Sequence, residues 1–227
     1  MRRCGSTPLP GKTTSVTLDL APISAYHFSP DGAGSFAEIV VHRRLEGTRP
    51  MRLVVGDKNR SARAMGPWVL LTEFGLPFEE LAAGADVDDA PVLVDDGGLV
   101  VRDTPAIAEF LAVKFPALAL WPRDARQRTR ARALCAELHA GCGARPADLA
   151  RVSAPWQAAL AASGGPFLFG GYSIADACCA PIALRLRTHA SPPPADIAAY
   201  VDRLVATRGV AAWIRAAQAA RPFDARG

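Results

Sequence analysis

The chain of 227 residues has little of what marks several classes of protein. Aromatic residues make up only 7% of it, and basic residues are interspersed with acidic ones. No basic stripe with interleaved aromatics therefore indicates a nucleic-acid surface. No apolar run approaches the roughly 20 residues that span a bilayer. Arg2 and Arg3 lie near the start, but no uninterrupted apolar segment follows them, so we expect no secretory signal. Neither nucleic acid nor a membrane is an expected partner.

Cysteine is also sparse, with five residues and no Cys-x-x-Cys pair. Cys135, His139 and Cys142 could share one helix face, but a fourth ligand is missing, so we predict no metal site. The odd number of cysteines, two of them adjacent, argues for a reducing compartment. We therefore expect a cytoplasmic protein in which the adjacent Cys178 and Cys179 are inert core thiols.

What the sequence does contain divides into three regions. Residues 1–50 show no sustained period, and we expect a disordered or wrongly annotated extension, with Met51 as the biological start. A genuine added element is the alternative. Residues 51–122 alternate between strand and helix patterns, which predicts an α/β domain with a mixed sheet. Residues 125–220 are rich in Ala, with apolar positions at helical spacing, which predicts an all-helical domain.

The most informative stretch, residues 90–109, predicts a hairpin followed by a capped helix. Two Asp and two Gly residues at 95–98 separate short apolar segments, which is a strong hairpin signal. Thr104 suits the N-cap of the next helix and Pro105 its first position. Free backbone N–H groups would then lie beside the Asp103 carboxylate and a hydroxyl. Such a site can receive a small zwitterion that carries an amine and a carboxylate.

These residues resemble the glutathione-binding half of the cytosolic glutathione S-transferases. The Pro before the third strand, the hairpin, the Asp-Thr pair and the Ala-Ile-Ala-Glu-Phe-Leu helix match that family, and the likeness covers roughly residues 51–220. The resemblance implies a thioredoxin-like N-terminal domain at 51–122 and an all-helical C-terminal domain at 125–220. It also implies glutathione as co-substrate and a homodimer.

The resemblance points to Ser61 as the catalytic residue. A glutathione enzyme must lower the pKa of the bound thiol, because the thiolate is the nucleophile. Serine-using members of the family do this from a Ser-Ser-Trp/Cys-Ser loop after the first strand. Ser61 falls on the first of those serines, and the three positions after it are Ala62, Arg63 and Ala64. A solvated turn serine is the alternative.

Other roles in glutathione binding follow from the same resemblance. A cis peptide bond at Pro91 would turn the Ala90 backbone groups toward the cysteinyl part of glutathione, beside Val92. Asp103 and Thr104 would bind the γ-glutamyl amine and carboxylate, respectively. Plain helix capping is the alternative reading of Asp103 and Thr104, and the two readings are compatible.

Three charged or capping elements complete the candidate residues. Arg60 and Arg63 flank the loop serine, and they are either solvated or steer the thiolate and a carboxylate-bearing second substrate. In the helical half, Ser173 and Asp176 form a Ser-x-x-Asp motif before an apolar run. The family has such a motif at its central helix, and we expect a structural capping box there, not a catalytic group.

We therefore expect a transferase that conjugates glutathione to a small electrophile in detoxification. A zeta-like glutathione-dependent isomerase, acting on a diacid, is the first rival. A non-catalytic glutathione-binding or protein-interaction module is the second. Three departures from the family favour that second rival. They are the altered serine loop, the acidic pair Asp88 and Asp89, and an interval between Gly141 and Trp156 that is shorter than in the family.

Overall fold

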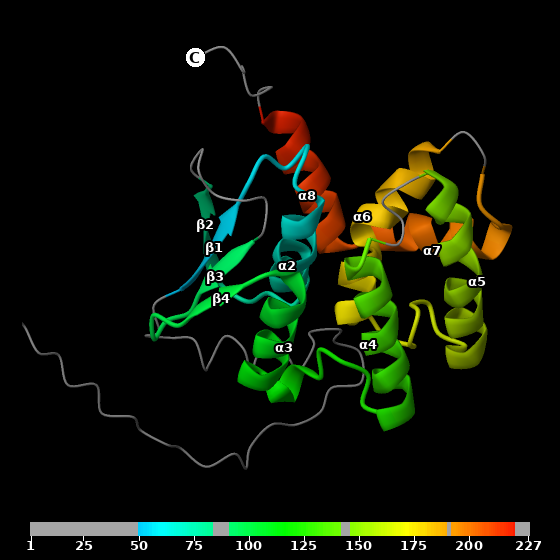
Figure 1. The fold of residues 1–227 in the computed structure, drawn as a ribbon, viewed down its shortest axis with the longest axis horizontal. Helices are drawn as coiled ribbons and strands as arrows, with labels where there is room; N and C mark the ends of the chain where they lie inside the picture. The colour runs from blue at the N-terminus through cyan, green and yellow to red at the C-terminus, as the bar shows by residue number, and fades with distance from the viewer. Residues whose placement is uncertain (1–49, 84–90, 142–145, 190–191, 221–227) are drawn as a thin grey trace, which may run out of the picture. The chain divides into compact units, whose positions relative to one another are not determined.

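The structure is a computed structural model that describes residues 50–83, 91–141, 146–189 and 192–220 (Figure 1). Apart from Pro50, the expected N-terminal extension lies outside these ranges. Ala90 and the expected cis bond to Pro91 lie outside them too. Within the described ranges, no helix has the length and apolar character needed to cross a bilayer. The same ranges hold no cluster of His, Cys, Asp or Glu suited to a metal ion.

The first half of the described chain is built on a mixed four-stranded sheet. Its strands are β1 (Met51–Val55), β2 (Phe78–Ala82), β3 (Val92–Val94) and β4 (Val100–Arg102). The order is β2-β1-β3-β4, with β1 parallel to β2 and the other two pairs antiparallel. β1 buries Met51, Leu53 and Val55 on one face, as the two-residue period of a strand requires.

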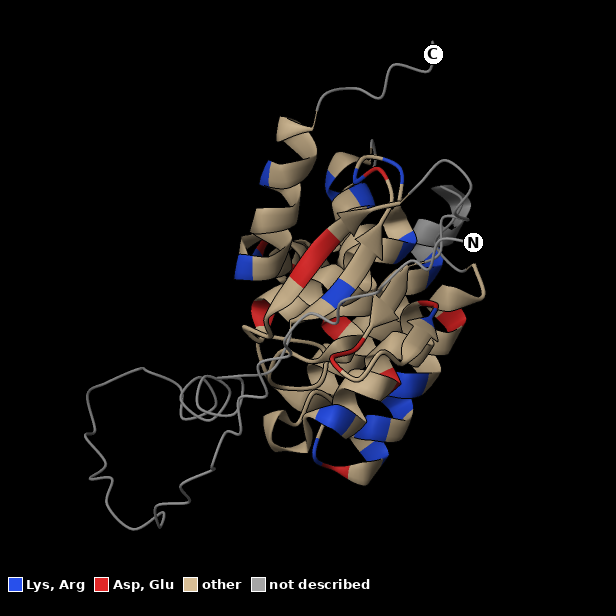
Figure 2. Ribbon diagram, turned by 90° about the vertical axis from the view of Figure 1, so that its left-hand side faces the viewer, with Lys and Arg blue, Asp and Glu red and all other residues tan. Residues whose placement is uncertain are grey.

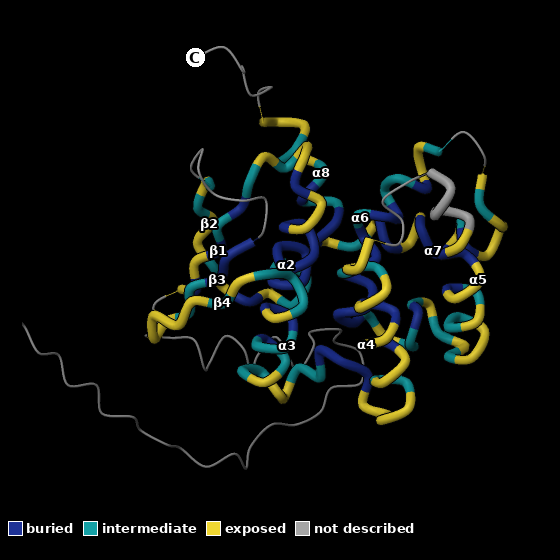
Figure 3. Tube along the Cα trace, in the orientation of Figure 1, coloured by how far each residue is buried: buried dark blue, intermediate teal, exposed yellow. Residues whose placement is uncertain are grey.

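Helix α2 (Ala62–Glu73) connects the two parallel strands and is buried from Ala64 to Leu71. It is covered on both sides because it lies between the sheet and the helical half (Figure 3). The helix begins at Ala62, five residues before Pro67. Pro67 is tolerated inside it because the Arg63 carbonyl, which the missing N–H would have bonded, accepts a hydrogen bond from the Thr104 hydroxyl at 2.8 Å.

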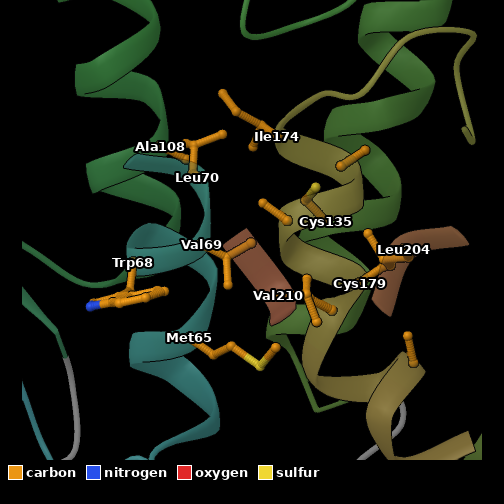
Figure 4. Close-up of a cluster of buried hydrophobic side chains, with 14 of the residues drawn as sticks. Met65, Trp68, Val69, Leu70, Ala108, Cys135, Ile174, Cys179, Leu204 and Val210 are labelled. Atoms are coloured by element: carbon orange, nitrogen blue, oxygen red, sulfur yellow. The ribbon is translucent and has the colours of Figure 1, made fainter. Parts of the chain in front are cut away.

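The second half is helical. After α3 (Thr104–Lys114) and a short 3-10 turn, η1 (Pro116–Leu118), its helices are α4 (Ala125–His139), α5 (Pro146–Ser163), α6 (Ile174–Thr188), α7 (Ala195–Ala206) and α8 (Arg208–Ala219). Helix α6 packs against α2, α4 and α7, and α8 packs against α2. In Figure 4, Val69 and Leu70 of α2 face Ile174 of α6 and Val210 of α8 across this junction. The α/β-plus-all-helical fold class is thereby confirmed.

A buried carboxylate organises the start of α6. Asp176 accepts hydrogen bonds from the backbone N–H groups of Leu168 (3.2 Å) and Ser173 (2.9 Å). The hydroxyls of Ser173 and Tyr200 donate to it as well, each at 3.0 Å. Burial raises the pKa of Asp176 to about 6, although these four donors act in the opposite direction. Asp176 therefore connects α6 to α7 and to the loop before α6.

Candidate functional site

A cavity of about 670 Å³ lies between the N-terminal turns of α2 and α3 and one face of α4 and α6. Small or short side chains line it on the α/β side: Ala62, Gly66, Thr104, Pro105 and Ala108, together with Arg63. Longer and more reactive side chains line it on the helical side, among them Arg132, Cys135, His139, Cys178 and Arg185. Figure 2 shows basic residues along α4, and of the arginines of this helix Arg132 is the one that lines the cavity.

The N-terminal turns of α2 and α3 are held close together at the cavity. The Thr104 hydroxyl of α3 donates to the Arg63 carbonyl of α2 at 2.8 Å. Gly66 permits the approach, because a Cβ there would meet the Thr104 methyl group at 3.2 Å. Two helix N-termini therefore face the same cavity, and the positive end of each helix dipole favours an anionic ligand.

Asp103 caps α3 and joins three parts of the chain. Its Oδ1 accepts from the Thr104 N–H at 2.8 Å, its own N–H donates to the Pro91 carbonyl at 3.0 Å, and its Oδ2 lies 3.0 Å from Nε2 of His139. The expected N-cap was Thr104, one residue later. Asp103 takes that place at φ +75° and ψ 147°, a strained conformation outside glycine. Asp103 is not itself among the residues that line the cavity, but its carboxylate contacts two that are, Thr104 and His139.

Ser61 lies at the N-cap of α2, beside the cavity and not on its wall. Its side chain is 1% exposed, and no described residue offers its hydroxyl a hydrogen-bond partner. The cavity wall next to it is formed by Ala62 and Arg63. A buried hydroxyl without a partner costs about 1–3 kcal/mol. Helix capping does not explain Ser61, because the hydroxyl makes no cap hydrogen bond.

The other expected site residues are placed as follows. Pro91 and Val92 are buried at the start of β3, and neither is among the residues that line the cavity. Arg60 is exposed in the turn before α2, whereas Arg63 does line the cavity. Ser173 and Asp176 belong to the buried start of α6. The fold thus brings Arg63, Asp103 and Thr104 together and leaves Arg60 apart.

The helical wall holds residues that the sequence did not assign to the site. Arg132 reaches across to α3 and donates to both Glu109 oxygens, at 2.7 and 2.8 Å, with its guanidinium 5.4 Å from the Trp121 ring centre. Cys178 lines the cavity, contrary to its expected place in the core. The spacing of Ile174, Cys178 and Arg185 on α6 follows one helix face, which could have indicated a shared wall.

No family model matches the chain, and no curated protein matches it. Solved structures do. A glutathione transferase homologue from Burkholderia, determined with bound glutathione, is 28% identical, with a TM-score of 0.59. That match covers 76% of this chain and 100% of the homologue. The chain belongs to the glutathione transferase family.

Other members share the fold at lower identity. A maleylacetoacetate isomerase from Anaeromyxobacter dehalogenans, with dicarboxyethyl glutathione and citrate in its active site, is 24% identical. It has a TM-score of 0.62 and covers 78% of this chain and 97% of its own. A glutathione transferase from Methylococcus capsulatus is also 24% identical, with a TM-score of 0.58 and coverage of 74% and 98%. These matches agree with a thioredoxin-like first half and a helical second half, and they do not fix the class within the family.

Proposed function

We propose that the cavity binds glutathione, with the γ-glutamyl end at the N-terminus of α3. The observation that carries this proposal is the capped end of α3, where Thr104 lines the cavity and Asp103 is bonded to Thr104 and His139, two of the lining residues. A carboxylate for the ligand amine and a helix N-terminus for the ligand carboxylate lie side by side there. The bound glutathione in the Burkholderia homologue supports the same ligand.

Binding would exchange one set of hydrogen bonds for another. Both Thr104 donors are used within the protein, its N–H by Asp103 and its hydroxyl by the Arg63 carbonyl. The γ-glutamyl carboxylate would take the Thr104 N–H from Asp103. The released Asp103 carboxylate would then accept from the ligand ammonium while keeping His139. Charge-assisted bonds replace a neutral donor in this exchange, which favours the bound state.

The reaction we propose is transfer of the glutathione thiolate to a small electrophile. Ser61 would donate to the sulfur and lower the pKa of the thiol, helped by the N-terminus of α2. Its buried hydroxyl, without a partner among the described residues, supports this role. The electrophile would lie against the wall formed by α4 and α6, where Leu138, Ile174 and Ile182 supply apolar contact.

Two rival functions each have an observation in their favour. Ser61 is not among the cavity-lining residues, which favours a glutathione-binding module without catalysis. Arg63 and Arg185 on the cavity wall would suit a diacid and favour a zeta-like isomerase, the activity named for the Anaeromyxobacter structure. Ala90 and Pro91 remain proposed contacts to the cysteinyl part, with Val92 beside them.

Two measurements test the proposal. Calorimetric titration measures glutathione binding, and the thiolate absorbance of the bound ligand, followed as a function of pH, measures its thiol pKa. We expect wild type to bind glutathione and to lower its thiol pKa. Ser61→Ala should bind equally well without the pKa shift, and Ser61→Thr, which keeps a hydroxyl, should retain part of the shift. Binding without any shift in wild type would establish the binding module. Absence of binding would overturn the proposed function.

Family membership also supports a homodimer and a role in cytoplasmic detoxification. Light scattering of the full chain should give twice the mass of one chain. A monomeric mass at micromolar concentration would remove the dimer from the proposal.

A further inference from the structure

A lysine lies between two tryptophans outside the cavity. Nζ of Lys58 is 5.4 Å from the ring centre of Trp68 on α2 and 5.4 Å from that of Trp213 on α8. The same amine pairs with Glu80 of β2, whose other oxygen accepts the Trp68 indole N–H at 2.6 Å. Figure 4 shows the Trp68 ring directed away from α6. The Lys58 side chain is only 11% exposed, so the two rings and the carboxylate hold it in a shielded place.

The next residue is tied to the end of α8. Nδ2 of Asn59 donates to the Ala217 carbonyl at 3.1 Å. Ala217 lies in the last turn of α8, where carbonyls have no acceptor role within the helix. The Asn59 N–H donates to the Asp57 carboxylate at 2.9 Å. Helix α8 therefore holds this loop at two points, through the Trp213 ring and through its final turn.

The loop held in this way ends at Ser61. The N–H groups of Arg60 and Ser61 both donate to the Asp57 carbonyl, at 2.9 and 2.7 Å. The Ser61 hydroxyl has no hydrogen-bond partner among the described residues, so the backbone of the turn sets where it lies. Lys58 and Asn59 are residues of the same turn. The contacts that hold them to α8 therefore also hold Ser61.

We infer that Lys58 and Asn59 are positioning residues for Ser61, and that the activation of the bound thiol depends on α8. The inference rests on the proposed function, in which the Ser61 hydroxyl donates to the glutathione sulfur. A hydrogen bond weakens steeply as its distance and angle depart from the optimum, and a displacement of about 1 Å is enough to impair a reacting geometry. Neither Lys58 nor Asn59 lines the cavity, so their effect on the thiol passes through Ser61.

The test compares variants that release the turn with one that does not. Lys58→Met keeps the stem and removes the cation, and Lys58→Arg restores a cation beside the rings. Asn59→Ala removes the donor to Ala217 at an exposed position and changes no charge. Lys114→Met is the matched control, because Lys114 also pairs with carboxylates and lies 5.6 Å from an aromatic ring, that of Phe110.

Each protein is measured in two ways, after circular dichroism has verified its fold. The thiolate absorbance of bound glutathione as a function of pH gives the thiol pKa. Amide hydrogen exchange without ligand gives the opening of the turn at 57–61. The second measurement does not depend on glutathione binding.

We expect Lys58→Met and Asn59→Ala to bind glutathione with its thiol pKa returned toward the value in solution, and with faster exchange in the turn. Lys58→Arg should keep most of the lowered pKa, and Lys114→Met should match wild type in both measurements.

The contradicting outcomes separate this inference from the proposed function. A lowered pKa retained in one releasing variant would remove that residue, and its retention in both Lys58→Met and Asn59→Ala would overturn the inference with the proposed function intact. An equal loss in Lys114→Met would overturn it too, because the effect would then be a general destabilisation. If wild type binds glutathione without lowering its thiol pKa, the transfer role of Ser61 fails, and the positioning role fails with it.

Discussion

The two walls of the cavity differ in the groups that they present to a ligand. The α/β wall consists of helix N-termini with short side chains, and its geometry is set by the contact between Thr104 and Arg63 and by the cap at Asp103. The helical wall instead presents long or reactive side chains, among them Arg132, His139 and Cys178. The first wall is suited to binding one constant ligand through backbone groups. The second can vary the chemistry without disturbing the fold, which is the usual division between scaffold and site.

The helical half should depend most on its buried carboxylate. Asp176→Ala removes the acceptor of four donors, two of them hydroxyls, and should lower the free energy of unfolding by about 3 kcal/mol or more. Urea denaturation measures the change. Asp202→Ala, at a side chain that is 71% exposed, is the matched control and should change stability by under about 0.5 kcal/mol. Equal effects at the two positions would contradict the role given to Asp176.

The same carboxylate predicts a dependence of stability on pH. Burial raises the pKa of Asp176 from 3.8 to about 6, so the native state holds the proton more tightly than the unfolded state. The contribution of Asp176 to stability should therefore fall as pH rises from about 4 to about 6, by on the order of 2–3 kcal/mol. Asp176→Asn cannot ionise at this position. As pH rises across that range, wild type should therefore lose stability relative to the variant. A difference that stays constant with pH would contradict the raised pKa.

The junction between the two halves should tolerate no added atom at Gly209. A Cβ there would lie 2.6 Å from the Val69 carbonyl oxygen, so Gly209→Ala must push α8 away from α2. We expect a loss of about 1–3 kcal/mol in the free energy of unfolding. Gly171→Ala, where a Cβ would meet nothing within 4 Å, is the control and should be close to neutral in the same thermal or urea titration.

The contact between the N-termini of α2 and α3 should contribute less to the free energy of unfolding than the packing at Gly209. Thr104→Val keeps the shape of the side chain and removes the donor to the Arg63 carbonyl, at a cost of about 1 kcal/mol. Thr104→Ser should recover most of it. If the contact also positions the site, Thr104→Val should weaken glutathione binding in calorimetry more than Thr104→Ser does. Unchanged stability and binding in Thr104→Val would remove this contact from the account.

The ion pair between the two walls should contribute least. Arg132 and Glu109 are bonded at both oxygens, but their side chains are 48% and 43% exposed. Solvent screens such pairs, so Arg132→Ala should cost only about 0.5 kcal/mol, and the cost should shrink in high salt. A large, salt-independent loss would show that the stem of Arg132 on Trp121 matters more than its charge.

The contrast between the walls also explains what the sequence could predict. The hairpin at 92–102 and the helix after Pro105 follow from turn and capping residues close together in the chain, and both are present. The cap at Asp103 was assigned one residue late, because its positive φ depends on contacts with Pro91 and His139. Cys178 was assigned to the core, because Cys178 and Cys179 have the same local pattern and only the packing of α6 separates them.

The central claim is that the N-terminus of α3 binds the γ-glutamyl end of glutathione. The most direct test is calorimetry on wild type and Asp103→Asn. Each protein is titrated with glutathione and with the dipeptide Cys-Gly, which lacks the γ-glutamyl end. Asp103→Asn keeps an oxygen for the Thr104 N–H and loses the charge that faces the ligand amine. The account predicts that wild type binds glutathione much more tightly than Cys-Gly, and that Asp103→Asn loses most of this difference with its fold intact. Equal binding of the two ligands by wild type, or an undiminished preference in Asp103→Asn, would contradict it.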